Sequence, residues 1–120
     1  MKAQKLARLI EESETLELVD ILENKKLSEI KGLISSNIKF LVNREVGKNS
    51  VGRVDVDITE TLEAEEEVRS ADTILGIYVV YFRDKSEYDG NFVADGSLYD
   101  GRFELMEITI GGVGLKYFGV

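Results

Sequence analysis

Cysteine and histidine are both absent from the 120 residues of this chain. Without cysteine the protein can form no disulfide, no thiolate nucleophile and no cysteine-ligated zinc site. Without histidine it has no imidazole metal ligand, no histidine-based catalytic triad and no imidazole acid–base group for neutral pH. Carboxylate, lysine and tyrosine chemistry stays open, but no catalytic motif is recognisable. We therefore expect a protein that is not an enzyme and uses no cofactor.

No apolar run in the sequence is long enough to cross a membrane. The longest, residues 74–82, has nine residues and includes Gly76, whereas a spanning helix needs about 20. Near the start, Lys2, Lys5 and Arg8 interrupt the apolar residues, so there is no continuous hydrophobic region of a signal peptide. We expect no membrane contact and a cytoplasmic location, which for a viral protein is the host cytoplasm.

The acidic charge is concentrated in one part of the chain. Hydrophobic residues make up 43% and charged residues 32% of the sequence, as in an ordinary single globular domain. The formal net charge is −8, yet residues 1–48 have a net charge of +1 and residues 49–120 a net charge of −9. A field of this sign repels nucleic acid and acidic lipid, favours a basic partner and keeps the protein soluble.

The first third of the chain shows helical periodicity. Ala3, Leu6, Ala7 and Ile10 recur at intervals of three and four residues, which predicts a helix over residues 2–12. A second helix is expected after an N-terminal cap at residue 13, with its end near residues 24–26. A third is expected to begin at residue 28 and to run through residue 34.

Residues 38–46 fit two structures. Ile38, Phe40 and Val42 alternate with polar residues as in a strand, but Leu41 and Arg44 break the alternation. A helix that continues to about residue 43 fits nearly as well. The sequence leaves both open.

Two later segments predict strands of different character. Val54, Val56 and Ile58 alternate with polar residues, which indicates a strand with one wet face. In residues 74–82 both alternating sets are apolar, so both faces of that strand need cover. Helices can cover one face of a small sheet, and the other must meet a second layer, a barrel interior or another protein chain. Between these strands, the acidic residues 63–67 fit either a short helix or the end of a hairpin.

Turn signals divide the C-terminal part of the sequence. Three dipeptides are typical of hairpin turns: Asp89-Gly90, Asp95-Gly96 and Asp100-Gly101. A bulge is expected near Leu105, and the glycine-rich residues 111–114 end that strand. Residues 115–120 are predicted to add a last edge strand.

The predicted fold is a single α+β domain. Two to three N-terminal helices, in a helical part over about residues 1–37, pack on a mainly antiparallel sheet of four to six strands over about residues 38–120.

Acidic side chains are the leading candidates for partner binding. They are Asp55, Asp57, Glu63, Glu65, Glu66 and Glu67. Asp55 and Asp57 share a strand face that could hold a hard cation, but no third ligand is evident, so we predict no metal site. Our leading hypothesis is a non-catalytic protein-interaction module: an acidic accessory or inhibitor protein of viral or mobile-element type that binds a basic surface.

Two other functions stay open. Residues 27–33 and 36–44 can be interpreted as the two helices of a winged helix-turn-helix, with Lys39, Arg44 and Lys48 at DNA phosphates. Asp55 and Asp57 would crowd the wing, and the net charge of −8 opposes binding to phosphates, so nucleic acid is not the expected partner. The other alternative is a structural subunit that self-assembles into a homo-oligomer through its sheet.

Overall fold

The structure, a computed structural model that describes residues 1–115, contains two α-helices, a short 3₁₀ helix and six strands in that part of the chain. In chain order they are α1 (Lys2–Ser13), β1 (Thr15–Leu18), β2 (Glu23–Lys26), the 3₁₀ helix η1 (Leu27–Glu29), α2 (Ile30–Val46), β3 (Val51–Leu62), β4 (Asp72–Phe82), β5 (Glu87–Tyr99) and β6 (Arg102–Gly111). Every strand pair is antiparallel. The predicted α+β class with an antiparallel sheet is therefore confirmed.

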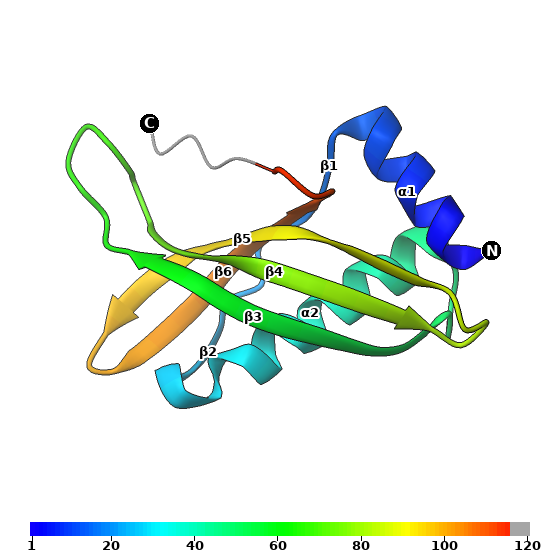
Figure 1. Ribbon diagram of the computed structural model, residues 1–120. Helices are drawn as coiled ribbons and strands as arrows, with labels where there is room; N and C mark the ends of the chain where they lie inside the picture. Colours follow the sequence, from blue (N-terminus) through cyan, green and yellow to red (C-terminus); the bar gives the residue numbers. More distant parts are fainter. Residues whose placement is uncertain (116–120) are drawn as a thin grey trace.

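The four long strands form a meander, and the two short strands extend it (Figure 1). β3, β4, β5 and β6 pair in sequence order. β1 pairs with residues 108–111 of β6, and β2 pairs with residues 102–105 of the same strand. One edge of the sheet is therefore formed by β3, and the other by β1 and β2 together.

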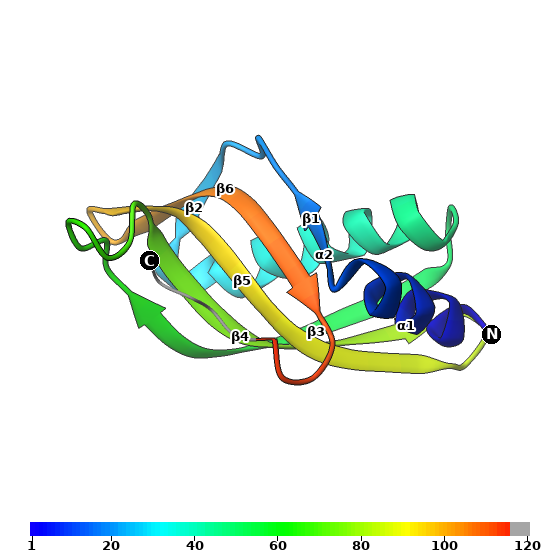
Figure 2. The same ribbon diagram turned by 90° about the horizontal axis from the view of Figure 1, so that it is seen from above.

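Both α-helices lie on the same face of the sheet (Figure 2). α2 buries one side along its whole length, with the apolar residues Ile30, Leu33, Ile34, Ile38, Leu41, Val42 and Val46. β4 adds Ile74, Tyr78, Val80 and Phe82 to the same core. Neither helix covers the opposite face, which we call the open face.

α2 decides between the two structures predicted for residues 38–46. The strand prediction is wrong and the helix is correct, because Leu41 is fully buried while Phe40 is 59% exposed. The apolar side chain of Phe40 produced the misleading alternation. The helix also extends beyond the predicted residue 43 and ends at Val46, before Gly47.

α1 is held at its N-terminal end by bonds to distant segments. The backbone N–H of Lys2 donates to Asp84 Oδ2 (2.8 Å), and that of Ala3 donates to Ser86 Oγ (3.2 Å), so the β4–β5 turn caps the helix. Hydrogen bonds from Ser86 and Lys2 lower the pKa of Asp84 to about 2. In addition, Lys5 Nζ donates to the C=O of Val46 at the end of α2 (3.0 Å).

The predicted second helix is wrong, because this segment forms β1 and β2 instead. The strand β6 offers an edge of backbone donors and acceptors, and both segments pair with it. Leu16 is buried, but Val19 and Leu22, which follow it at helical spacing, are 51% and 63% exposed. This segment therefore pairs with β6 and does not form a helix, whose apolar side chains would find no core to pack against.

Two of the three predicted hairpin turns are wrong, because Gly90 and Gly96 lie inside β5. Each glycine allows the backbone of the neighbouring strand β6 to lie close to β5, and neither forms a turn. A Cβ on Gly90 would lie 2.0 Å from the C=O oxygen of Gly111, and one on Gly96 would lie 1.9 Å from that of Glu104. The third turn, Asp100-Gly101, is confirmed, with positive φ at both residues.

The end of the sheet agrees with the prediction as far as the structure describes it. A register shift opposite Asp95 and Gly96 makes Met106 the extra residue of a bulge, next to the predicted Leu105. β6 ends at Gly111, as expected. The predicted last edge strand lies almost entirely outside the described residues.

The close approach at Gly96 gives a stability test. Replacing Gly96 with Ala is expected to lower the free energy of unfolding by about 1–3 kcal/mol, because the Cβ would overlap backbone and the Phe103 ring. Gly32 of α2 is the matched control, since a Cβ there meets nothing within 4 Å. Gly32→Ala should raise the free energy of unfolding by up to about 1 kcal/mol. Urea unfolding of both variants measures this, and equal effects would contradict the described packing.

Candidate functional site

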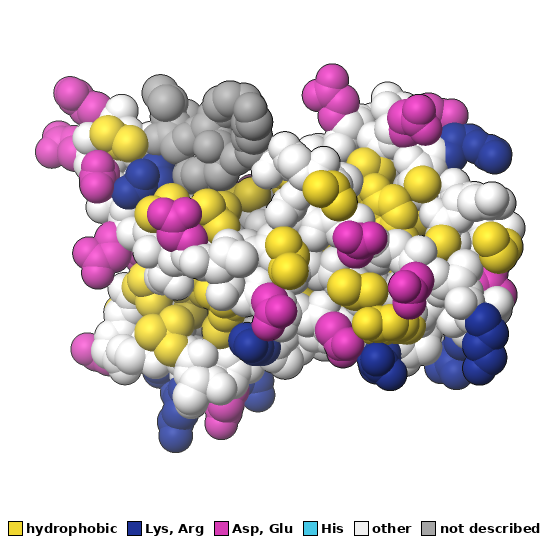
Figure 3. Space-filling view, viewed as in Figure 1, with side chains coloured by type: hydrophobic (Ala, Val, Ile, Leu, Met, Phe, Trp, Pro, Cys, Tyr) yellow, Lys and Arg dark blue, Asp and Glu magenta, His cyan; other side chains and the backbone are white. Residues whose placement is uncertain are grey.

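The open face has an apolar stripe along β4. It consists of Leu75, Ile77, Val79 and Tyr81, which alternate with the core residues of the same strand. Ile77 is 43% exposed and the other three are half-buried. Figure 3 shows this face, where hydrophobic side chains gather in patches with acidic side chains among them. The sequence predicts that both faces of β4 are covered, and residues 1–115 cover only one of them with helices.

Acidic residues flank the stripe because of the strand register. Val79 lies between Asp55 of β3 on one side and Asp89 of β5 on the other. Ile77 is paired with Asp57 in the same way. Directly opposite residues share a sheet face, so these carboxylates lie beside the exposed apolar side chains. The structure thus brings two of the predicted acidic residues, Asp55 and Asp57, together with the stripe.

The two carboxylates have weak local partners. Arg53 Nε lies 3.4 Å from Asp55 Oδ1, and the Asp55 carboxylate raises the pKa of Arg53 by hydrogen bonding. The Arg53 guanidinium also lies over the Tyr81 ring, 4.1 Å from its centroid. Lys31 Nζ of α2 lies 3.6 Å from Asp57 Oδ1. Exposed pairs of this kind contribute little to stability, because water and salt screen the charges.

A groove of about 510 Å³ follows β3. Lys31, Gly32 and Ser35 of α2 form one wall, and residues 54–57 of β3 line its length. It continues to Ile77 and Val79 on the open face. The groove therefore joins the free edge of the sheet to the apolar stripe.

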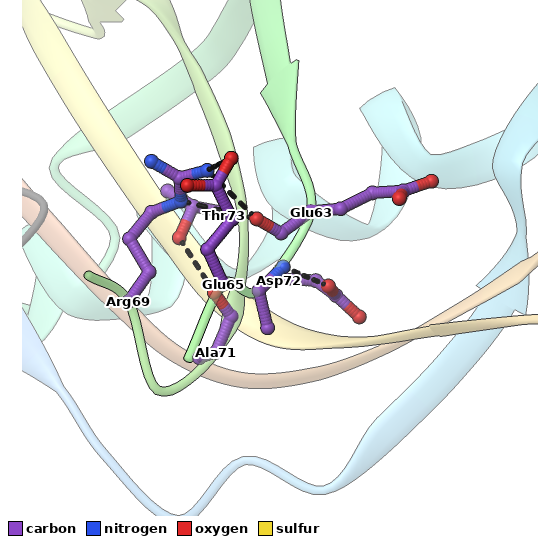
Figure 4. Close-up of polar contacts among 7 residues, drawn as sticks. Glu63, Glu65, Arg69, Ala71, Asp72 and Thr73 are labelled. Atoms are coloured by element: carbon purple, nitrogen blue, oxygen red, sulfur yellow. Dashed lines mark hydrogen bonds and ion pairs between the residues drawn. The ribbon is translucent and has the colours of Figure 1, made fainter. Parts of the chain in front are cut away.

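The acidic residues 63–67 belong to the end of the β3–β4 hairpin, which decides between the two structures predicted for them. Arg69 Nη2 donates to the C=O of Glu63 (2.8 Å) and lies 3.3 Å from Glu65 Oε1 (Figure 4). Asp72 Oδ1 accepts a bond from Ala64 N–H (2.6 Å). The backbone of Glu63 and the carboxylate of Glu65 therefore hold the turn together.

Glu66 and Glu67 are exposed at the same turn, which extends beyond the sheet (Figure 1). The predicted acidic surface is thus divided between two places. Asp55 and Asp57 lie on the sheet, and the glutamates lie at the hairpin end.

A second group of acids, which the sequence did not predict, lies where β5, β6 and β1 meet. Asp95 is paired with Glu107, and Glu17 is close enough to Glu107 to raise its pKa. Burial is the main cause of the raised pKa of both Asp95 and Glu107. Thr73 Oγ1 donates to Asp95 Oδ1 (2.8 Å). Only the strand register brings these residues together, so no local sequence pattern could have identified them.

The predicted DNA-binding residues lie on one continuous helix and in the turn that follows it. α2 continues through Ile30–Val46, so the turn of a helix-turn-helix is absent from this described segment and that geometry is wrong. Arg44 Nη2 donates to the C=O of Glu17 (3.0 Å) and pairs with Glu45. Lys39 lies on the same helix, and Lys48 lies in the turn that follows it.

Comparison with known proteins gives no relative. No family model, curated protein or solved structure matches the chain. In the described part of the chain, no three acidic side chains are arranged to hold a metal ion. No helix within residues 1–115 is long and apolar enough to cross a bilayer.

The raised pKa of Glu107 predicts a pH-dependent stability. The folded state binds a proton at Glu107 more readily than the unfolded state, whose Glu pKa is about 4.3. Stability from this group is therefore lost as pH rises from that value through the folded-state pKa. Glu107→Gln should be more stable than the wild type at pH 7, by less than about 1 kcal/mol. The gain should vanish as pH falls below the unfolded-state value of about 4.3, because both states of the wild type then bind the proton.

Urea unfolding between pH 3.5 and 7 tests this prediction. The control is Glu104→Gln on the same strand, because Glu104 is paired with Ser97 and not with an acid. A gain that is independent of pH, or equal in the control, would contradict the account.

Proposed function

We propose that the protein is a non-catalytic protein-interaction module that binds a basic partner protein on the open face of its sheet. The observation that carries this proposal is the apolar stripe of β4 with carboxylates on both sides. An exposed apolar surface with a polar border is typical of a protein-binding site.

The two kinds of side chain have different roles in the proposed complex. The stripe residues Ile77 and Val79 lose water on binding, and this burial supplies affinity. Asp55, Asp57 and Asp89 select a partner with Lys or Arg around an apolar patch, and the net charge of −9 over residues 49–120 attracts it from a distance. The same charge opposes nucleic acid and a second copy of this chain.

The proposal includes a biological role for this binding. An acidic protein that occupies a basic surface blocks whatever else that surface binds. We therefore propose an accessory or inhibitor role, of viral or mobile-element type, in the cytoplasm of the cell that contains the partner.

Charge reversal on β3 tests the electrostatic part. Asp55→Lys combined with Asp57→Lys is expected to abolish capture of the proteins that the wild type retains from a cell lysate. Glu11→Lys combined with Glu12→Lys makes the same change in net charge on exposed residues of α1 and should leave capture intact. Bound proteins are compared by mass spectrometry. If both double variants retain the same proteins as the wild type, β3 is not the binding surface.

A second substitution tests the apolar stripe. Ile77→Asp should reduce capture by at least about tenfold, because a buried unpaired charge costs more than 1.4 kcal/mol. Val19→Asp, at a similarly exposed residue outside the stripe, should have no effect. Equal capture by both variants would contradict the proposed role of the stripe.

A further inference from the structure

β3 has a row of backbone groups at the edge of the sheet. It is 12 residues long, and within residues 1–115 its one partner strand is β4. Along an antiparallel strand, the N–H and C=O groups of successive residues point alternately toward and away from the partner strand. Ser35 Oγ donates to the C=O of Val54 (2.7 Å) from the α2 side, so the groups of Val54 point away from β4. Those of Val56 and Ile58 point the same way.

Two of these outward residues are available for pairing. Within residues 1–115, no strand or loop backbone bonds the outward groups of Val56 and Ile58. The register of β3 with β4 is regular from Arg53 to Ile58, with an irregularity on either side. A regular edge with unpaired backbone groups is a template for another strand.

The groove beside β3 has room for the side chains of such a strand. Directly opposite residues share a face, so a residue opposite Val56 would point toward α2. There the wall is Gly32, and a Cβ on Gly32 would meet no heavy atom within 4 Å. The volume of the groove is about 510 Å³, within the range of about 300–1,000 Å³ found for small-molecule sites, so side chains of an added strand can enter it.

The carboxylates of β3 favour basic side chains on the other face of the added strand. Residues opposite Asp55 and Asp57 would point to the open face, beside two carboxylates. Lys31 already reaches Asp57 across the groove, at 3.6 Å, although both side chains are mostly exposed. Lys or Arg on the added strand would take the same position.

Pairing of β3 with a second copy of itself is disfavoured. A two-fold antiparallel pair centred on Val56 would place Asp55 opposite Asp57 of the other copy, and like charges directly opposite destabilise a sheet. A pair centred on Val54 would need the C=O that Ser35 already occupies. Neither of these two registers suits a second copy, whereas a basic chain meets no like charge at Asp55 and Asp57.

We propose that β3 accepts a strand from a basic partner protein, antiparallel to it as in every other pair of this sheet. The added segment has Lys or Arg at alternate positions facing Asp55 and Asp57, and apolar residues between them facing Val56 and α2. This inference rests on the proposed protein-interaction function and states how the partner is held. Backbone bonds supply affinity, and the alternate side chains supply specificity.

Synthetic peptides test the inference without knowledge of the partner. The probe is a blocked seven-residue peptide, Val-Lys-Val-Lys-Val-Lys-Val. In the proposed register the N–H groups of its valines point to β3, and those of its lysines point to solvent. A peptide N-methylated on the valines should bind at least about tenfold more weakly than the unmodified peptide, because bonds to β3 are lost. A peptide N-methylated on the lysines should retain binding.

Changes in the amide chemical shifts of the full chain on addition of peptide report the site of binding. The largest changes should centre on residues 54–58. Without peptide, the protein should be a monomer in light scattering at micromolar concentration. In the chain itself, Gly32→Phe should fill the groove and abolish peptide binding, while Gly32→Ala should retain it.

Four outcomes would overturn the inference. They are equal binding of all three peptides, binding of none, shifts that centre on Ile77 and Val79 with residues 54–58 unchanged, and a dimer that pairs through β3. The proposed function is judged separately, since Ile77→Asp tests the stripe and none of these peptides does.

Discussion

The packing of α2 on one face of the sheet determines the surface that this protein presents. β4 is apolar on both faces, and α2 can bury only one of them. The side that contains Tyr78 and Val80 enters the core, and the side that contains Ile77 stays exposed. The position of α1 follows from the same arrangement, because its N-terminal cap comes from the turn between β4 and β5. The open face is thus a consequence of how the core is completed.

Electrostatics favour a basic partner in the proposed complex. The register places Asp55, Asp57 and Asp89 beside the stripe, and the ion pairs that Asp55 and Asp57 form are exposed. The pair of Asp95 and Glu107 on the same sheet has raised pKa values, so the folded protein holds ionised carboxylates at some cost in stability. Charges that lower stability are more easily explained by binding than by folding. A basic partner would relieve them.

The sequence predicts elements whose pattern is strong and fails where tertiary contacts decide. α1 and β3 have clear periodicity and β4 is a continuous apolar run, and all three are where the sequence predicts them. Residues 14–26 have a helical stripe, yet they form strands, because the edge of β6 is the competing partner and lies far along the sequence. Gly90 and Gly96 follow aspartate as in turns, but they serve close contacts across the sheet.

The candidate site shows the same division. Asp55 and Asp57 could be placed on one strand face from the alternation of β3 alone. Their position beside Ile77 and Val79, and the groove under Gly32, depend on register and on helix packing, which no local pattern contains. The acidic residues 63–67 were predicted from composition, and most of their local contacts stabilise a hairpin turn.

Thiol labelling tests most directly whether β4 has one buried and one open face. Because the chain contains no cysteine, a single introduced cysteine reports its own environment. Ile77 and Val80 lie on the same strand, three positions apart, and point to opposite faces of the sheet, so Ile77→Cys and Val80→Cys form a matched pair. The account predicts that the cysteine at position 77 reacts with an aqueous thiol reagent nearly as fast as in the unfolded chain, and the one at position 80 at least about a hundredfold more slowly, because it reacts only on opening. Slow labelling at both positions would contradict the open face.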